Sequence, residues 1–136
     1  MKKDKNVLLI NKILYLKNMN EFNNIRGDLL TNLAENLELV HFDENQELMD
    51  SEDYRNSALY LILSGGAVAY SDDIKVCEFT SNSIVDDFFI NKTDHYKITA
   101  TSKTVAFKLN KSDRDQIIYE NQQMAERFLD IAKIYN

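Results

Sequence analysis

The chain has 136 residues, of which 44% are hydrophobic and 28% are charged, the composition of an ordinary globular protein. This length predicts one domain with its own core, and no apolar run reaches the roughly 18 residues of a membrane span. A net charge of −6 repels polyanions, so we expect no direct binding of nucleic acid. The single cysteine, Cys77, excludes an internal disulfide and fits a reducing compartment, so we expect a cytoplasmic protein.

The first third of the chain predicts helices. Its basic start and the apolar residues 7–16 have the outline of a signal peptide, but Asn11 and Lys12 interrupt the apolar part and no small-residue cleavage site follows. We therefore expect a helix over residues 6–18 with one apolar face. That face is formed by Val7, Ile10, Ile13 and Leu14. A helical turn over residues 21–25, with Phe22 inward, and a second helix over residues 28–36 should follow.

From Leu37 onward the pattern changes to short β-prone runs separated by polar turns. The expected strands cover residues 37–42, 46–49, 58–63, 67–71, 74–79, 96–101 and 104–109. The run at 58–63 is apolar on both faces, which predicts a strand that is covered on both sides. Ser64, Gly65 and Gly66 separate it from the next run, and glycine tolerates the positive φ that a tight hairpin needs.

The last part of the chain predicts an amphipathic helix or a helix pair. Asn110 or Ser112 can cap its start, and Asp113 follows Asn110 at the spacing of a capping box. Helices, then seven or eight short strands, then helices indicate an α+β fold that is mainly β. We expect an antiparallel β-barrel or jelly roll, a double-stranded β-helix, with N-terminal and C-terminal helices. One domain over 1–136 would comprise helices at 6–36, the barrel at 37–109 and helices at 111–135.

The hairpin sequence also resembles that of a known family. Its matching residues are Leu59, Tyr60, Ile62, Ser64, Gly65 and Val68. They resemble the "LYxIxSGxVxV" hairpin of the cyclic nucleotide-binding domains. The order of helices, strands and helices is also similar to that family's over nearly the whole chain. The resemblance implies this fold and a regulatory role, in which ligand occupancy moves the C-terminal helix and thereby switches an effector.

The phosphate-binding part of that family is altered in this chain. A cyclic phosphate needs backbone N–H donors at a helix start and a cation opposite them. The family supplies a Gly-Glu pair, whose glutamate binds the ribose hydroxyl, and an arginine. This chain has no glycine after Gly66 and no arginine between Arg55 and Arg114. The resemblance therefore implies the fold but argues against the usual ligand.

Aligning the chain on Phe79 and Ala100 places two acids, Asp86 and Asp87, at the Gly-Glu pair, and Asp94 at the arginine. The pocket positions that the resemblance implies are Asp86, Asp87, Phe88, Asp94, His95, Tyr96 and Lys97. A structural alternative is that the two acids only stabilise the N-terminus of a helical turn over residues 87–90.

We therefore expect a non-enzymatic regulatory or interaction module that has lost cyclic AMP and cyclic GMP binding and needs no cofactor. No catalytic group has a visible partner, and His41 and His95 lack the spacing of a metal site. One alternative is a divergent cyclic nucleotide sensor, which would use Asp87 with Lys92 or Lys97 and would have an open cavity under Phe88 and Tyr96.

A second alternative is a structural or dimerisation module, in which Tyr96 or Phe89 fills the ligand space. The C-terminal helix is expected to dock on its own barrel. A second copy of the chain or a protein partner at this helix are the alternatives, and no membrane span is expected.

Overall fold

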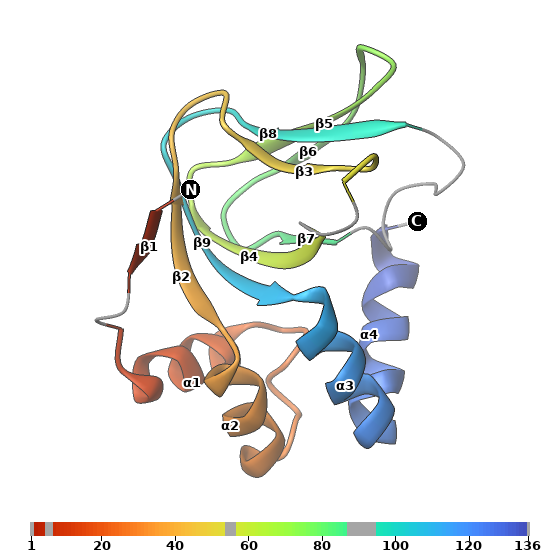
Figure 1. Cartoon of the computed structure of the whole chain (residues 1–136). Helices are drawn as coiled ribbons and strands as arrows, with labels where there is room; N and C mark the ends of the chain where they lie inside the picture. Colours follow the sequence, from red (N-terminus) through yellow and green to blue (C-terminus); the bar gives the residue numbers. More distant parts are fainter. Residues whose placement is uncertain (1, 5–6, 54–56, 87–94, 136) are drawn as a thin grey trace.

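The computed structural model describes residues 2–4, 7–53, 57–86 and 95–135, and it shows a β-roll with helices at one end (Figure 1). The helices are α1 (Leu9–Asn18), α2 (Gly27–Glu35), α3 (Lys111–Glu120) and α4 (Gln122–Tyr135). The strands are β1 (Lys2–Asp4), β2 (Glu38–Phe42), β3 (Glu47–Asp50), β4 (Ala58–Ser64), β5 (Ala67–Ser71), β6 (Ile74–Phe79), β7 (Ile84–Val85), β8 (Tyr96–Ala100) and β9 (Thr104–Asn110).

The strands form two antiparallel sheets within the described residues. One has the order β1-β2-β9-β4-β7 and the other the order β3-β8-β5-β6. All seven predicted strands are present, at the predicted bounds or within one residue of them. The short strands β1 and β7 were not predicted, because three and two residues are too few to show an alternating pattern. The fold class predicted from the sequence is confirmed.

Two hydrophobic clusters share the five-stranded sheet between them. Leu59 and Leu61 of β4 belong to the cluster that joins the sheet to the helices. Tyr60 and Ile62 point to the opposite side and belong to the cluster inside the roll. Strand β4 is thus buried on both faces, as its uninterrupted apolar sequence predicts.

The hairpin between β4 and β5 turns at the predicted glycines. Gly65 has a φ of 86°, and a Cβ there would lie 2.5 Å from the carbonyl oxygen of Lys103. The Gly66 N–H donates to Thr104 Oγ1 at 3.1 Å. Only glycine combines this backbone angle with so close an approach to the neighbouring chain.

The orientation predicted for the N-terminal helix is wrong in part. Ile10 and Leu14 are exposed, at 54% and 51%, whereas Leu16 is completely buried. Tertiary contacts decide which side of α1 faces inward. The Tyr15 ring packs on Phe107 with centroids 5.4 Å apart, and Lys12 Nζ donates to the Leu37 carbonyl, just before β2. Apolar spacing alone did not identify this side, because α1 has apolar residues around most of its circumference.

The C-terminal part forms a helix pair that docks on its own chain. Asn110 lies at the N-cap of α3 but makes no capping hydrogen bond through its side chain, so that detail of the prediction is wrong. Between the helices, Asn121 Oδ1 accepts the Met124 N–H at 3.1 Å and caps α4. Phe128 of α4 is buried, and its ring meets Phe22 edge-to-face with centroids 6.2 Å apart. Both residues belong to the hydrophobic cluster that the helices share with the five-stranded sheet. Among the described residues, no helix has the length and apolar character needed to cross a membrane.

Candidate functional site

Asp86 lies directly after β7 and forms a buried ion pair with Arg114 in the first turn of α3. Asp86 Oδ1 accepts a hydrogen bond from Arg114 Nη1. The side chains are only 1% and 2% exposed. Arg114 also donates from Nε and Nη2 to Asp115 Oδ1, both at 3.2 Å. The first acid of the predicted pair is thus directed toward the C-terminal helices and neutralised there.

Arg114 was not among the predicted site residues. No pattern in the sequence marks it, because α3 is polar on most sides and only the structure shows that Arg114 is one of the two buried residues of this helix. A buried arginine requires a carboxylate or several acceptors. The sequence does not show which acid it pairs with.

Three of the predicted pocket residues, Asp87, Phe88 and Asp94, lie outside the described residues. The predicted helical turn over residues 87–90, together with the alternatives that involve Phe89 and Lys92, also lies there. These assignments stay predictions.

The other predicted residues lie at the start of β8, beside an open cleft of about 340 Å³. The cleft is lined by Asp50, Glu52, Tyr70, Asp72, Asp73, His95, Tyr96 and Lys97. Two local features build it. The end of β3 is joined to β8 by mutual hydrogen bonds, in which the Tyr96 N–H donates to Ser51 Oγ at 3.0 Å and the Ser51 N–H donates to the Tyr96 carbonyl at 2.9 Å.

The second feature is the two-residue turn between β5 and β6. Asp72 and Asp73 have φ angles of 50° and 67°, the left-handed pair that a tight hairpin requires. Aspartate tolerates this conformation better than most residues. The turn therefore places two carboxylates at the cleft.

The basic side chains of the cleft have carboxylates close to them. Lys97 Nζ lies 3.7 Å from Glu47 Oε1 and 4.0 Å from Asp50 Oδ2. His95 Nδ1 lies 3.4 Å from Glu52 Oε1. The cleft is lined by four carboxylates against one lysine and one histidine. Such a lining suits hydroxyl groups and cations, and it disfavours a phosphate.

Inside the roll, aromatic and aliphatic side chains of the described residues pack into one cluster. The rings of Phe42 and Tyr60 meet edge-to-face with centroids 5.5 Å apart. The Tyr60 hydroxyl donates to the Leu48 carbonyl at 3.2 Å. Tyr96, only 8% exposed, packs into the same cluster as Met49.

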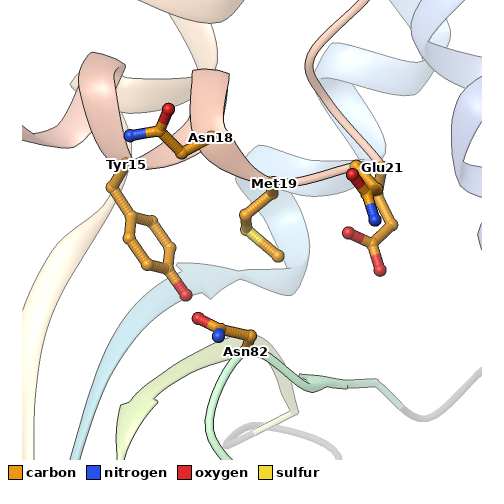
Figure 2. Close-up of a pocket in the computed structure, with 6 residues that line it drawn as sticks. Tyr15, Asn18, Met19, Glu21 and Asn82 are labelled. Carbon is orange, nitrogen blue, oxygen red and sulfur yellow. The ribbon is translucent and has the colours of Figure 1, made fainter.

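A second pocket, of about 370 Å³, lies between the end of α1 and the turn before β7 (Figure 2). The Tyr15 hydroxyl points toward Asn82 across it, with Met19 beside them (Figure 2). Glu21 also lines the pocket. The Tyr15 hydroxyl donates to the Ile62 carbonyl at 3.4 Å. This pocket was not predicted from the sequence, because its residues come from segments more than 60 positions apart.

The side chains of Tyr15, at the second pocket, and Tyr60, inside the roll, predict a loss of stability at high pH. Burial, with a smaller contribution from Glu21, raises the pKa of Tyr15 to about 12, and burial also raises the pKa of Tyr60. Above pH 10 the unfolded chain loses these protons while the folded chain keeps them. The folded state then binds more protons, so the free energy of unfolding should fall as pH rises from 10 toward 12.

Urea unfolding at a series of alkaline pH values measures this fall, and Tyr15→Phe or Tyr60→Phe should make it shallower. A free energy of unfolding that stays constant over this range would contradict the prediction. In the described part of the chain, no group of His, Cys, Asp or Glu side chains is arranged to hold a metal ion.

Comparison with known proteins gives matches at the level of structure. No protein-family model matches the sequence, and no curated protein matches it significantly. The crystal structure of a "putative cyclic nucleotide-binding protein" from Geobacter metallireducens GS-15 is similar with a TM-score of 0.77 and 17% identity, over 90% of this chain and 92% of that chain.

Two regulatory proteins of kinases are also similar. The regulatory domain of Toxoplasma gondii PKA in complex with cAMP has a TM-score of 0.72 and 12% identity, over 90% of this chain and 49% of that one. The regulatory subunit of a cAMP-independent protein kinase A from Trypanosoma cruzi, bound to guanosine, has a TM-score of 0.65 and 20% identity, over 75% and 39%. This chain thus spans half or less of the kinase regulatory chains. The strand order, the flanking helices and these similarities together establish that the chain has the fold of the cyclic nucleotide-binding domains.

Proposed function

We propose that this protein is a non-enzymatic regulatory module, folded as one domain over residues 1–136, that has lost the cyclic AMP and cyclic GMP binding typical of its fold. We further propose that it acts in the cytoplasm and passes its signal to a protein partner or a second copy through the C-terminal helices. Tyr119 of α3 and Leu129 of α4, which are 91% and 62% exposed, are available for such a contact.

One observation carries the loss of ligand binding. Lys97 of the predicted phosphate site lies near Asp50 and Glu47, and Arg114, which contacts the predicted site residue Asp86, is paired with it. A cyclic phosphate would have to compete with these carboxylates for both cations. The packing of Tyr96 and Tyr60 inside the roll supports the same proposal.

The energy of the charge–charge interactions decides whether cyclic nucleotide binding is merely weakened or lost. Two unit charges 4 Å apart interact by about 4 kcal/mol at an effective dielectric constant near 20. Exchanging an attraction of this size for a repulsion moves a dissociation constant by several powers of ten, since about 1.4 kcal/mol corresponds to a factor of ten.

A second candidate function is that of a sensor for a nucleoside or another uncharged polyhydroxyl compound. The guanosine-bound Trypanosoma cruzi protein has the same fold and is described as cAMP-independent. The cleft at β8 offers carboxylates and Tyr70 to hydroxyl groups, with no excess of positive charge. This candidate keeps the regulatory role and changes the ligand class.

A thermal-shift titration with millimolar cyclic AMP, cyclic GMP and guanosine tests both candidates. A ligand at a thousand times its Kd adds about 4 kcal/mol of stability, which for this size is a rise of about ten degrees. We expect no shift with either cyclic nucleotide. A shift with cyclic AMP that Lys97→Ala or Asp87→Ala abolishes would contradict the proposal, and a shift with guanosine alone would favour the second candidate.

A further inference from the structure

A compact apolar patch covers the N-terminal end of α1. It consists of Leu8, Leu9, Ile10 and Leu14, which are 64%, 39%, 54% and 51% exposed. Nine large hydrophobic side chains are exposed in the described part of the chain, and four of them lie in this run of seven residues. Exposed apolar groups scattered singly need no explanation, but a contiguous group of this kind marks an interaction site.

Contacts on the inner side of α1 fix the orientation of this helix, and they thereby keep the patch on the surface. On the inner side, Leu16 is completely buried, Lys12 Nζ donates to the Leu37 carbonyl at 2.6 Å, and Tyr15 packs on Phe107. Ile10 and Leu14 are one helical turn apart on the other side. In Figure 1, α1 lies at the outer margin of the helical layer, with β1 above it.

The charge of this region is opposite to that of the rest of the chain. The first 17 residues contain five lysines and one aspartate, a net charge of +4, which leaves −10 for the remaining 119 residues. Residues 5–20 contain no acid at all, in a chain with 22 acidic residues. Lys17 of α1 is exposed near the patch, whereas Lys12 Nζ is bound to the Leu37 carbonyl. The segment that carries the patch therefore combines apolar side chains with lysines and with no acid of its own between residues 5 and 20.

We propose that α1 docks this patch on an anionic lipid surface. Apolar side chains beside lysines, on a short helix at the margin of a protein, are the features of helices that lie in the membrane interface. The apolar side chains enter the headgroup region while the lysines contact lipid phosphates. The ten-residue helix is far too short to cross a bilayer, so it lies along the surface.

The acidic remainder of the chain sets the orientation. An anionic surface repels the part with a net charge of −10, so only the face that carries α1 approaches it. Binding through four apolar side chains and a few lysines is weak and reversible, and it is sensitive to salt. This inference is independent of the proposed loss of cyclic nucleotide binding.

Co-sedimentation of the full chain with lipid vesicles tests the proposal. The probes are vesicles of phosphatidylcholine alone and of phosphatidylcholine mixed with phosphatidylglycerol. We expect binding to the mixed vesicles only, and weaker binding at high salt. The double variant Ile10→Gln/Leu14→Gln should lower the affinity about tenfold or more, because it removes the inserted side chains. Ile74→Gln, at a similarly exposed isoleucine on β6, is the matched control and should bind as the unchanged chain does.

Because all three substituted residues are exposed, the variants should unfold at the same temperature as the unchanged chain, which separates a binding defect from a folding defect. No binding to the anionic vesicles would overturn the proposal, and so would equal binding by the double variant. Sedimentation equilibrium without lipid can also overturn the proposal. If the unchanged chain is a dimer and the double variant is a monomer, the patch binds a second copy of the chain.

Discussion

Removing one partner of the Asp86–Arg114 ion pair should lower the free energy of unfolding by about 3–5 kcal/mol. Either Asp86→Ala or Arg114→Met leaves the other group charged and buried without this ion pair, since the two side chains are 1% and 2% exposed, and in the Asp86→Ala variant Arg114 keeps its contact with the half-exposed Asp115. Most of the loss comes from the buried charge that remains, which water does not reach. Urea unfolding followed by circular dichroism measures the change.

Two controls distinguish this effect from the mere loss of a contact. Replacing both partners by apolar residues, as Asp86→Leu/Arg114→Met, should restore much of the stability, because no buried charge remains. Arg26→Ala removes the exposed ion pair with Asp28 and should cost less than about 1 kcal/mol. If the double variant were as unstable as both single variants together, the buried charge that each single variant leaves would not be the cause.

The Phe128→Ala variant should lower the free energy of unfolding by about 3–5 kcal/mol. The ring is only 4% exposed, meets Phe22 at 6.2 Å and belongs to the cluster that joins the helices to the five-stranded sheet. Truncation therefore removes buried area and leaves a cavity between elements from both ends of the chain. Thermal and urea unfolding measure the loss.

The neighbouring Leu129→Ala is the matched control, since Leu129 is 62% exposed. It should change the free energy of unfolding by no more than about 0.5 kcal/mol. Similar losses at both positions would mean that α4 does not dock in the orientation described here.

The ion pair also bears on how a signal could pass through the molecule. Asp86 immediately precedes residues 87–94, where the resemblance predicts the phosphate-binding segment, and Arg114 lies in the first turn of α3, the first of the two C-terminal helices. The pair thus joins the start of that segment directly to α3. The same contact that neutralises a predicted ligand residue connects it to the proposed output helices.

Most of the fold could be predicted from the sequence because its signals are local. Alternating apolar runs and polar turns located seven strands, and the hairpin at Gly65 and Gly66 followed from the backbone angles that glycine allows. The order of these elements, with the hairpin residues from Leu59 to Val68, was sufficient to indicate the fold that the structural comparisons confirm. These features depend only on neighbours in the chain.

The functional details depended on contacts between distant segments. No local pattern shows that Asp86 pairs with a residue 28 positions away, or that the turn at Asp72 and Asp73 shares a cleft with His95. Likewise, α1 is apolar around most of its circumference, so only its packing against Phe107 decided that Leu16 is buried and Leu14 exposed. The sequence determined the elements and their order through local backbone preferences and hydrophobic periodicity. The tertiary structure decided which charges are neutralised and which apolar face remains open, because both depend on what packs against each side chain.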